Sequence, residues 1–204
     1  MGGLTPDEHM EDTLLRWNRL NDRGLTISKS SSPQKTNYIQ TTVVRTMTGL
    51  RRKDKEIKDK TEIEAVLREA TVGRLGTSRD DTPYVVPVSY VYDNGKIIIH
   101  GAKQGKKMED IAANPRVCFE VDTSEIITSD DPCNYSYRYK SVIANGTAKI
   151  LEDPHEKLAG LRLLTEKYAP GKGPELTEEH LKKNRNLNVV EITIHEMVGK
   201  KSPA

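Results

Sequence analysis

The dipeptide Asn94-Gly95 stands between two runs rich in β-branched and aromatic residues, 84–92 and 96–100. Asn and Gly both tolerate the positive φ angles of a two-residue hairpin turn, so this arrangement is a strong local signal of a β-hairpin. The two runs are therefore predicted to be antiparallel neighbours in one sheet. Any fold proposed for this chain has to contain that hairpin.

Further strands are predicted at residues 72–77, 117–121, 139–151 and 189–195, with a bend or bulge at Gly146. Helices are expected at about 61–70, 106–113 and 153–168, and from residue 177. The first of these helices is expected to open with the capping box Thr61-Glu62-Ile63-Glu64. Residues 123–138 are predicted to form a long polar loop. About six strands without strict βαβα alternation favour a mainly β fold with helices, built as a small antiparallel barrel.

Two parts of the chain differ in character. Residues 1–50 contain one short amphipathic segment around Trp17 and a polar connector at 28–42, so they are predicted to be an N-terminal extension, partly helical or flexible. Residues 51–204 are predicted to form the folded domain. The mixed-charge run at 51–58 is interpreted as its solvated beginning.

Charge and composition exclude several functions. The 204 residues carry 32 basic and 30 acidic side chains, a net charge of +2, which makes nucleic acid an improbable partner. No apolar run reaches the 18 or so residues of a membrane span, and acidic residues stand where a signal peptide would be basic, so the expected compartment is the cytoplasm. Cys118 and Cys133 suggest no disulfide framework, and the five histidines show no metal-ligand spacing.

The segment from His100 to Asp110 carries the clearest candidate site. It runs from a strand end through Gly101 and Gly105 into a predicted helix that begins with Lys106 and Lys107. The free N–H groups of a helix N-terminus bind anions, whereas cations in the first turn oppose the helix dipole. A bound phosphate would explain the lysines, and a merely solvated lysine cluster is the alternative. The spacing is not that of a P-loop, so nucleotide hydrolysis is disfavoured.

Residues 51–200 carry a series of short motifs in a characteristic order. They are Arg51-Arg-Lys-Asp-Lys-Glu-Ile57, Val72-Gly-Arg-Leu-Gly76, Tyr84-Val-Val-Pro-Val88, His100-Gly-Ala102, Gly105-Lys-Lys107, Asn114-Pro-Arg-Val-Cys-Phe-Glu-Val121, Ser141-Val-Ile-Ala-Asn-Gly146 and Gly199-Lys200. In order and spacing the chain resembles the FMN-binding split-barrel family related to pyridoxamine 5′-phosphate oxidase, and within it the branch of nitroimidazole-resistance proteins.

The resemblance implies an antiparallel split β-barrel that holds FMN at a homodimer interface. It implies that one strand lies against the flavin ring, that a strand end follows the ribityl-phosphate arm, that a lysine pair binds the phosphate, and that the partner completes the site through its 135–142 region. The cofactor-binding residues implied in this way are Tyr84, Val85, Val86, Pro87, Val88, Ser89, His100, Gly101, Ala102, Lys106, Lys107, Tyr139 and Ser141.

The chain also departs from the oxidase itself. Tyr84 stands where the oxidase carries an arginine, and no tryptophan follows Trp17, so oxidation of pyridoxamine phosphate is not expected. The preferred hypothesis is an FMN-dependent oxidoreductase that reduces a small electron-poor acceptor such as a nitroaromatic compound, the flavin carrying the chemistry. The alternatives are a non-catalytic flavin- or haem-binding carrier or redox sensor and, more distantly, a nucleic-acid-associated regulator.

Overall fold

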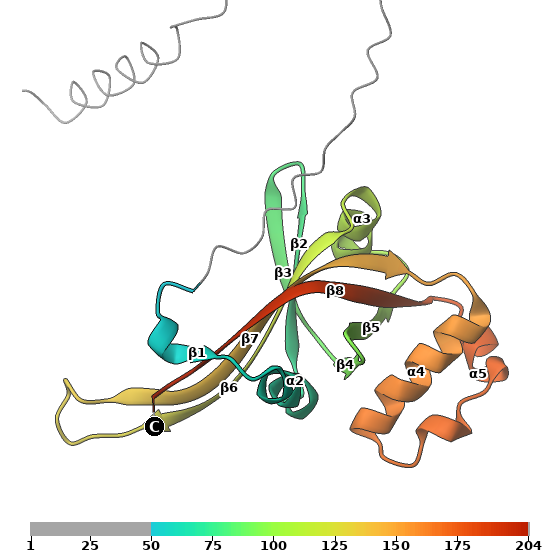
Figure 1. Ribbon diagram of the computed structural model, residues 1–204. Coiled ribbons are helices and arrows are strands. Elements are labelled where there is room, and N and C mark those ends of the chain that lie inside the picture. Colours follow the sequence, from blue (N-terminus) through green and yellow to red (C-terminus); the bar gives the residue numbers. More distant parts are fainter. Residues whose placement is uncertain (1–49, 204) are drawn as a thin grey trace, which may run out of the picture. The chain divides into compact units, whose positions relative to one another are not determined.

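The computed structural model describes residues 50–203, so residues 1–49 of the predicted extension lie outside the described part of the chain. The described residues form eight strands, four α-helices and two short 3-10 helices (Figure 1). In chain order these are η1 (Lys53–Lys55), β1 (Glu56–Ile57), α2 (Lys60–Glu69), β2 (Gly73–Arg79), β3 (Thr82–Val88), β4 (Tyr90–Asp93), β5 (Lys96–Ala102), α3 (Lys106–Ala113), β6 (Arg116–Ile127), β7 (Ser136–Ile150), α4 (Pro154–Tyr168), η2 (Gly173–Glu175), α5 (Glu178–Lys183) and β8 (Leu187–Lys201).

The strands form one antiparallel sheet in the order β3-β2-β6-β7-β8-β5-β4, and β1 pairs with the far end of β8. The two end strands, β3 and β4, follow each other in the chain and are separated by Ser89 alone. Within the described residues no hydrogen-bonded ladder joins them. The sheet therefore curls back on itself without closing, which confirms the predicted antiparallel split-barrel class.

The hairpin that the sequence signals most strongly is present. β4 pairs with β5 from Tyr90 opposite Ile99 to Asp93 opposite Lys96, and the turn residues Asn94 and Gly95 have φ angles of 45° and 82°. The prediction of one continuous strand over 84–92 was wrong, however. The run is interrupted at Ser89, and its first half pairs with β2 rather than with β5. Both halves are β-rich, so their composition could not reveal that they belong to opposite ends of the sheet.

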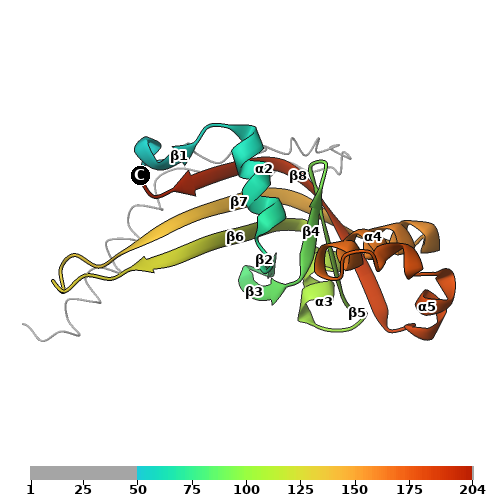
Figure 2. The ribbon, with the colours of Figure 1, turned by 90° about the horizontal axis from the view of Figure 1, so that it is seen from below.

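The predicted polar loop at 123–138 was also wrong. β6 and β7 continue as a two-stranded ribbon as far as Ile127 opposite Ser136, and only residues 128–135 connect them (Figure 2). The side chains of this ribbon are exposed on both faces, as in the cross-strand ion pair of Arg138 with Glu125 at 3.3 Å. A strand with no buried face shows no alternation of apolar and polar residues, so the usual sequence signal is missing.

Two local predictions have different outcomes. α2 is capped by Asp59, whose carboxylate accepts a hydrogen bond from the Thr61 N–H at 2.8 Å, so the capping box predicted at Thr61 was wrong. The predicted irregularity at Gly146 is confirmed, because the register of β7 against β8 shifts between Asn145 and Gly146. A Cβ at this position would overlap the carbonyl oxygen of Thr193, so the close approach of the two strands requires glycine.

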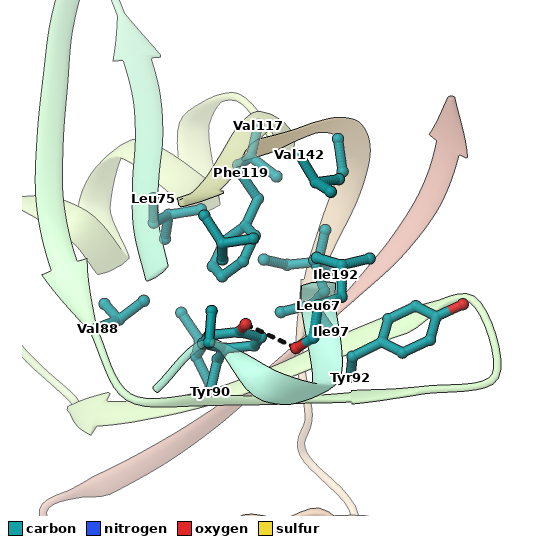
Figure 3. Packing of buried hydrophobic residues seen from close by; sticks show 14 of the residues in the cluster. Leu67, Leu75, Val88, Tyr90, Tyr92, Ile97, Val117, Phe119, Val142 and Ile192 are labelled. Carbon is teal, nitrogen blue, oxygen red and sulfur yellow. Dashed lines mark hydrogen bonds between the residues drawn. The ribbon is translucent and has the colours of Figure 1, made fainter. Parts of the chain in front are cut away.

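The main hydrophobic core fills the space between the curved sheet and α2 (Figure 3). Phe119 of β6 and Tyr90 of β4 meet edge to face, with ring centroids 4.8 Å apart, although their strands are distant in the sheet order. The Tyr90 hydroxyl donates a hydrogen bond to the Leu67 carbonyl of α2 at 2.7 Å. Helix α2 therefore packs on strands β4, β6 and β7, and the core joins distant strands of the curved sheet.

Tyr90 provides the first testable prediction. Replacing it by phenylalanine keeps the ring but leaves the Leu67 carbonyl without its donor, so we expect the free energy of unfolding at pH 8 to fall by about 1–3 kcal/mol. Burial, with a smaller contribution from nearby Tyr168, raises the pKa of Tyr90. Above about pH 10 the unfolded chain therefore loses a proton that the folded chain retains. The free energy of unfolding of the wild type then falls by up to about 1.4 kcal/mol per pH unit because of this group.

The difference in the free energy of unfolding between the wild type and Tyr90→Phe should accordingly become smaller as the pH rises from 10 to 11. Urea denaturation at pH 8, 10 and 11 measures it. A difference that stays constant over this range would show that Tyr90 does not remain protonated in the folded protein.

Candidate functional site

The free edge of β3 offers backbone groups to a ligand. β3 pairs with β2 on one side only. Pro83 and Pro87 have no N–H to donate to a ladder, and prolines in sheets face the open side of an edge strand. Pro83, Val85 and Pro87 are alternate residues of β3. The backbone groups of all three therefore point away from β2. The open edge presents the carbonyl oxygens of all three and the N–H of Val85.

The side chains of β3 alternate between the two faces of the sheet. Val88 is buried in the core and Tyr84 and Val86 are partly buried, whereas Val85 on the opposite face is 63% exposed. The ring of Tyr84 lies 5.3 Å below the ammonium of Lys106, at the start of α3. The predicted ring-supporting strand and the predicted phosphate-binding helix therefore lie next to each other.

Lys107 is the unusual cation of this region. Its side chain is half-buried, and burial alone lowers the pKa of its ammonium group. No carboxylate of residues 50–203 forms an ion pair with it, and its Nζ lies so close to Gly101 that a Cβ there would be 2.8 Å away. Gly101 thus makes room for the ammonium over the end of β5. A half-buried cation without a counter-ion is a site for an anion.

Lys106 has a different environment from its neighbour. Its ammonium donates to both carboxylate oxygens of Asp110, each at 3.0 Å, and Asp110 is fully buried. The Thr77 hydroxyl donates to the same carboxylate at 2.9 Å. Burial opposes ionisation of Asp110, but the hydrogen bonds from Lys106 and Thr77 outweigh it and lower its pKa. Asp110 therefore neutralises Lys106 and anchors α3 to β2.

The N-terminus of α3 adds donors beside Lys107. Gly105 is the residue before the helix, with a φ of 124°, and it provides no side chain to cap the first turn. The first N–H groups of α3 are therefore available for an anion. The predicted anion site at this strand-to-helix junction has both a cation and free backbone donors.

Ser89 and His100 line one cavity, which extends beneath α4. Burial and the neighbouring charge of Lys107 lower the pKa of His100. The residues predicted to follow the flavin thus lie in one region of the chain: Tyr84 to Ser89, His100 to Ala102, and Lys106 with Lys107. Tyr139 and Ser141 do not join them. They lie near the start of β7, where Ser141 pairs with both β6 and β8, at the opposite end of β7 from α3 (Figure 1).

Comparison with known proteins identifies the family of the chain. Residues 59–201 match the pyridoxamine 5′-phosphate oxidase family. The chain belongs to that family. Among solved structures, a candidate 5-nitroimidazole antibiotic resistance protein from Bacteroides thetaiotaomicron VPI-5482 is 26% identical with a TM-score of 0.62, over 71% of this chain and 85% of that one.

A second solved structure and one protein sequence are also similar to this chain. The flavocytochrome Anf3 from Azotobacter vinelandii has a TM-score of 0.66 at 20% identity, over 76% of this chain and 73% of that one, which shows a shared fold. An uncharacterized protein of Rhizobium meliloti (strain 1021) is 25% identical over 122 residues, which is 56% of this chain and 74% of that protein.

In the part of the chain from 50 to 203, no three His, Cys, Asp or Glu side chains form a group that could hold a metal ion. None of the described helices is both long enough and apolar enough to cross a membrane. Cys118 and Cys133 are free thiols.

Sequence reasoning missed two residues that support this candidate site. Asp110 follows Lys106 by four positions, the spacing of an ion pair on a helix, and that signal was available in the sequence. Tyr168, at the end of α4, accepts a hydrogen bond from the Tyr90 N–H at 2.8 Å and lies 2.8 Å from the Thr71 carbonyl and 2.9 Å from that of Tyr90. No local pattern connects residues 78 positions apart.

The second prediction concerns Asp110. Asp110→Asn removes the charge that Lys106 and Thr77 stabilise, so we expect Tm at pH 7 to fall by more than about 5 °C. Because the pKa of Asp110 is lowered in the folded protein, its contribution is complete above the ordinary carboxyl pKa and is lost as the pH falls below about 4. The Tm of the variant should therefore be closer to that of the wild type at pH 3 than at pH 7.

Glu109→Gln is the matched control. Glu109 is the exposed neighbour on α3, 3.4 Å from Arg79, and its substitution should leave Tm almost unchanged. Thermal unfolding followed by circular dichroism compares the two variants. Equal losses for both would mean that the buried network does not anchor α3.

Proposed function

We propose that this protein is an FMN-binding flavoprotein, and that it acts as an oxidoreductase on a small electron-poor acceptor such as a nitroaromatic compound. The observation that carries the proposal is the half-buried ammonium of Lys107 over Gly101, which has no ion-pair partner among residues 50–203 and lies next to the uncapped N-terminus of α3. A phosphate monoester brings a charge of about −1.5 to −2 at neutral pH, which suits one free cation and a helix N-terminus.

The remaining residues fit the rest of the cofactor. Lys107 and the first N–H groups of α3 would hold the phosphate, and the strand end at His100, Gly101 and Ala102 would follow the ribityl chain. The open edge of β3 offers carbonyl oxygens and the Val85 N–H to the polar rim of a flavin ring. When bound, a flavin supplies reversible electron transfer that the side chains of a protein do not provide.

We also propose that the active form is a homodimer whose partner subunit completes the site. The reason is that Tyr139 and Ser141, which the family resemblance assigns to the cofactor, lie at the opposite end of β7 from α3, the helix that carries Lys107. The ribbon carries exposed apolar side chains, Ile126 at 63% and Tyr137 at 52%. Exposed apolar groups on a protruding element are typical of an interface between subunits.

The proposed acceptor and its alternatives rest on different comparisons. Similarity to the candidate 5-nitroimidazole resistance protein favours a nitroaromatic acceptor. A second structural neighbour, with a TM-score of 0.65 at 19% identity, is a FAD and heme binding protein from Mycobacterium smegmatis. A carrier or redox sensor that binds flavin or haem is therefore the second candidate. The visible spectrum of the purified protein separates the two cofactors, since haem gives a Soret band.

The third prediction tests the phosphate site. Lys107→Ala should weaken FMN binding about 10- to 100-fold, because charge-assisted hydrogen bonds contribute about 1.5–3 kcal/mol. Lys103→Ala in the preceding loop is the control, since Lys103 is exposed and its change should have little effect. Fluorescence titration of the flavin-free protein with FMN measures both. Equal affinities for the wild type and Lys107→Ala would place the phosphate elsewhere.

The fourth prediction separates an enzyme from a carrier. After chemical reduction, the FMN-loaded protein should reduce a nitroaromatic compound faster than free reduced FMN at equal concentration. Tyr137→Ala should alter this rate while leaving the flavin content nearly unchanged, because the phosphate contacts are separate from the ribbon. Stopped-flow absorbance with a nitroaromatic compound and with oxygen gives the rates. If neither oxidant reacts faster with the protein than with free reduced FMN, the carrier or sensor is the better description.

A further inference from the structure

A second binding space lies beside the proposed flavin site. It is a cavity of about 580 Å³ between α4, the η2–α5 segment and β5. Its wall is mainly aliphatic, and six leucines contribute to it: Leu158, Leu161, Leu164, Leu176, Leu181 and Leu187. Sites for small organic molecules have about this volume and an apolar lining of this kind.

The far wall of the cavity is held in place by hydrogen bonds outside it. The Arg162 guanidinium donates to the Leu176 carbonyl at 3.1 and 2.8 Å. The Glu166 carboxylate accepts from the Gly171 N–H at 2.8 Å and from the Gly173 N–H at 3.2 Å. These charged side chains of α4 tie down the loop that leads into α5. The cavity is therefore a defined space and not a gap left by a loosely placed segment.

No lysine, arginine, aspartate or glutamate lines this cavity. Of the two histidines that do, His100 has a pKa lowered by burial and by Lys107. A charged ligand would give up its hydration here without gaining an opposite charge, at a cost of several kcal/mol. The lining therefore selects for an uncharged molecule.

His180 provides a polar group with a defined orientation. Its Nδ1 accepts a hydrogen bond from the Thr177 N–H at 3.1 Å and lies 2.9 Å from the Thr177 hydroxyl. A nitrogen that accepts a hydrogen bond carries no proton, so the ring proton is on Nε2. This leaves one N–H donor on a cavity-lining ring for a ligand oxygen.

We propose that this cavity binds an uncharged, mostly apolar small molecule that carries a hydroxyl or carbonyl oxygen. The apolar part contacts the leucines of α4 and α5, and the oxygen accepts a hydrogen bond from His180. Because Ser89 and His100 belong both to the cavity and to the proposed flavin site, the ligand lies next to the cofactor. Binding itself requires no flavin, so the inference stands independently of the proposed function.

The test uses 2-naphthol and 2-naphthalenesulfonate, which share a ring system and differ in charge. Equilibrium dialysis against the full-length, flavin-free protein measures both. We expect 2-naphthol to bind at least tenfold more tightly than the sulfonate. Equal binding of the two probes, or no binding of 2-naphthol, would overturn the proposal. Failure of FMN to bind would affect only the proposed flavin site.

Matched tryptophan variants locate the probe. Leu161→Trp fills the cavity and should reduce 2-naphthol affinity at least tenfold, whereas Leu163→Trp, at an exposed position on the same helix and outside the lining, should not change it. Leu181→Trp fills the cavity from α5 and replaces Leu161→Trp if the latter does not fold. Unchanged affinity in a folded cavity-filling variant would show that the probe binds elsewhere.

Discussion

The structure depends on how Tyr90 holds together a sheet whose end strands do not pair. Its hydroxyl group is bonded to Leu67 of α2, its ring packs on Phe119 of β6, and its backbone N–H is bonded to the Tyr168 hydroxyl of α4. Elements from three parts of the chain therefore meet at the first residue of β4. A closed barrel would satisfy its edges with ladder hydrogen bonds. Here side chains perform that task, and the edge of β3 remains free for other contacts.

The charge arrangement at α3 gives two adjacent lysines different functions. Asp110 is buried and holds Lys106, so this pair stabilises the helix against β2. Lys107 has no such partner and lies over Gly101. The difference between the two lysines comes from their positions around the helix axis, since consecutive residues of a helix point about 100° apart. One residue anchors the site and the other is available to a phosphate.

The two proposed binding spaces share Ser89 and His100, which lie where β3 ends and where β5 leads toward α3. The proposed phosphate site is cationic and has backbone donors, whereas the cavity beneath α4 has no formally charged side chain in its lining. Such neighbouring environments suit an anionic cofactor and an uncharged reactant respectively. The charged residues of α4, Arg162 and Glu166, support the cavity from outside without altering the character of its lining.

The sequence by itself determined the local elements: the Asn94-Gly95 turn, the helix that begins at Lys106, the helix capped by Asp153, the bulge at Gly146 and the order of motifs that indicates the family. The turn and the two helix starts depend on the conformational preferences of a few adjacent residues. Only the tertiary structure decided that the run at 84–92 divides at Ser89, that Asp110 is buried against Thr77, and that Tyr168 is bonded to Tyr90. The last two features depend on contacts between residues 33 and 78 positions apart, whose burial and pairing no local pattern encodes.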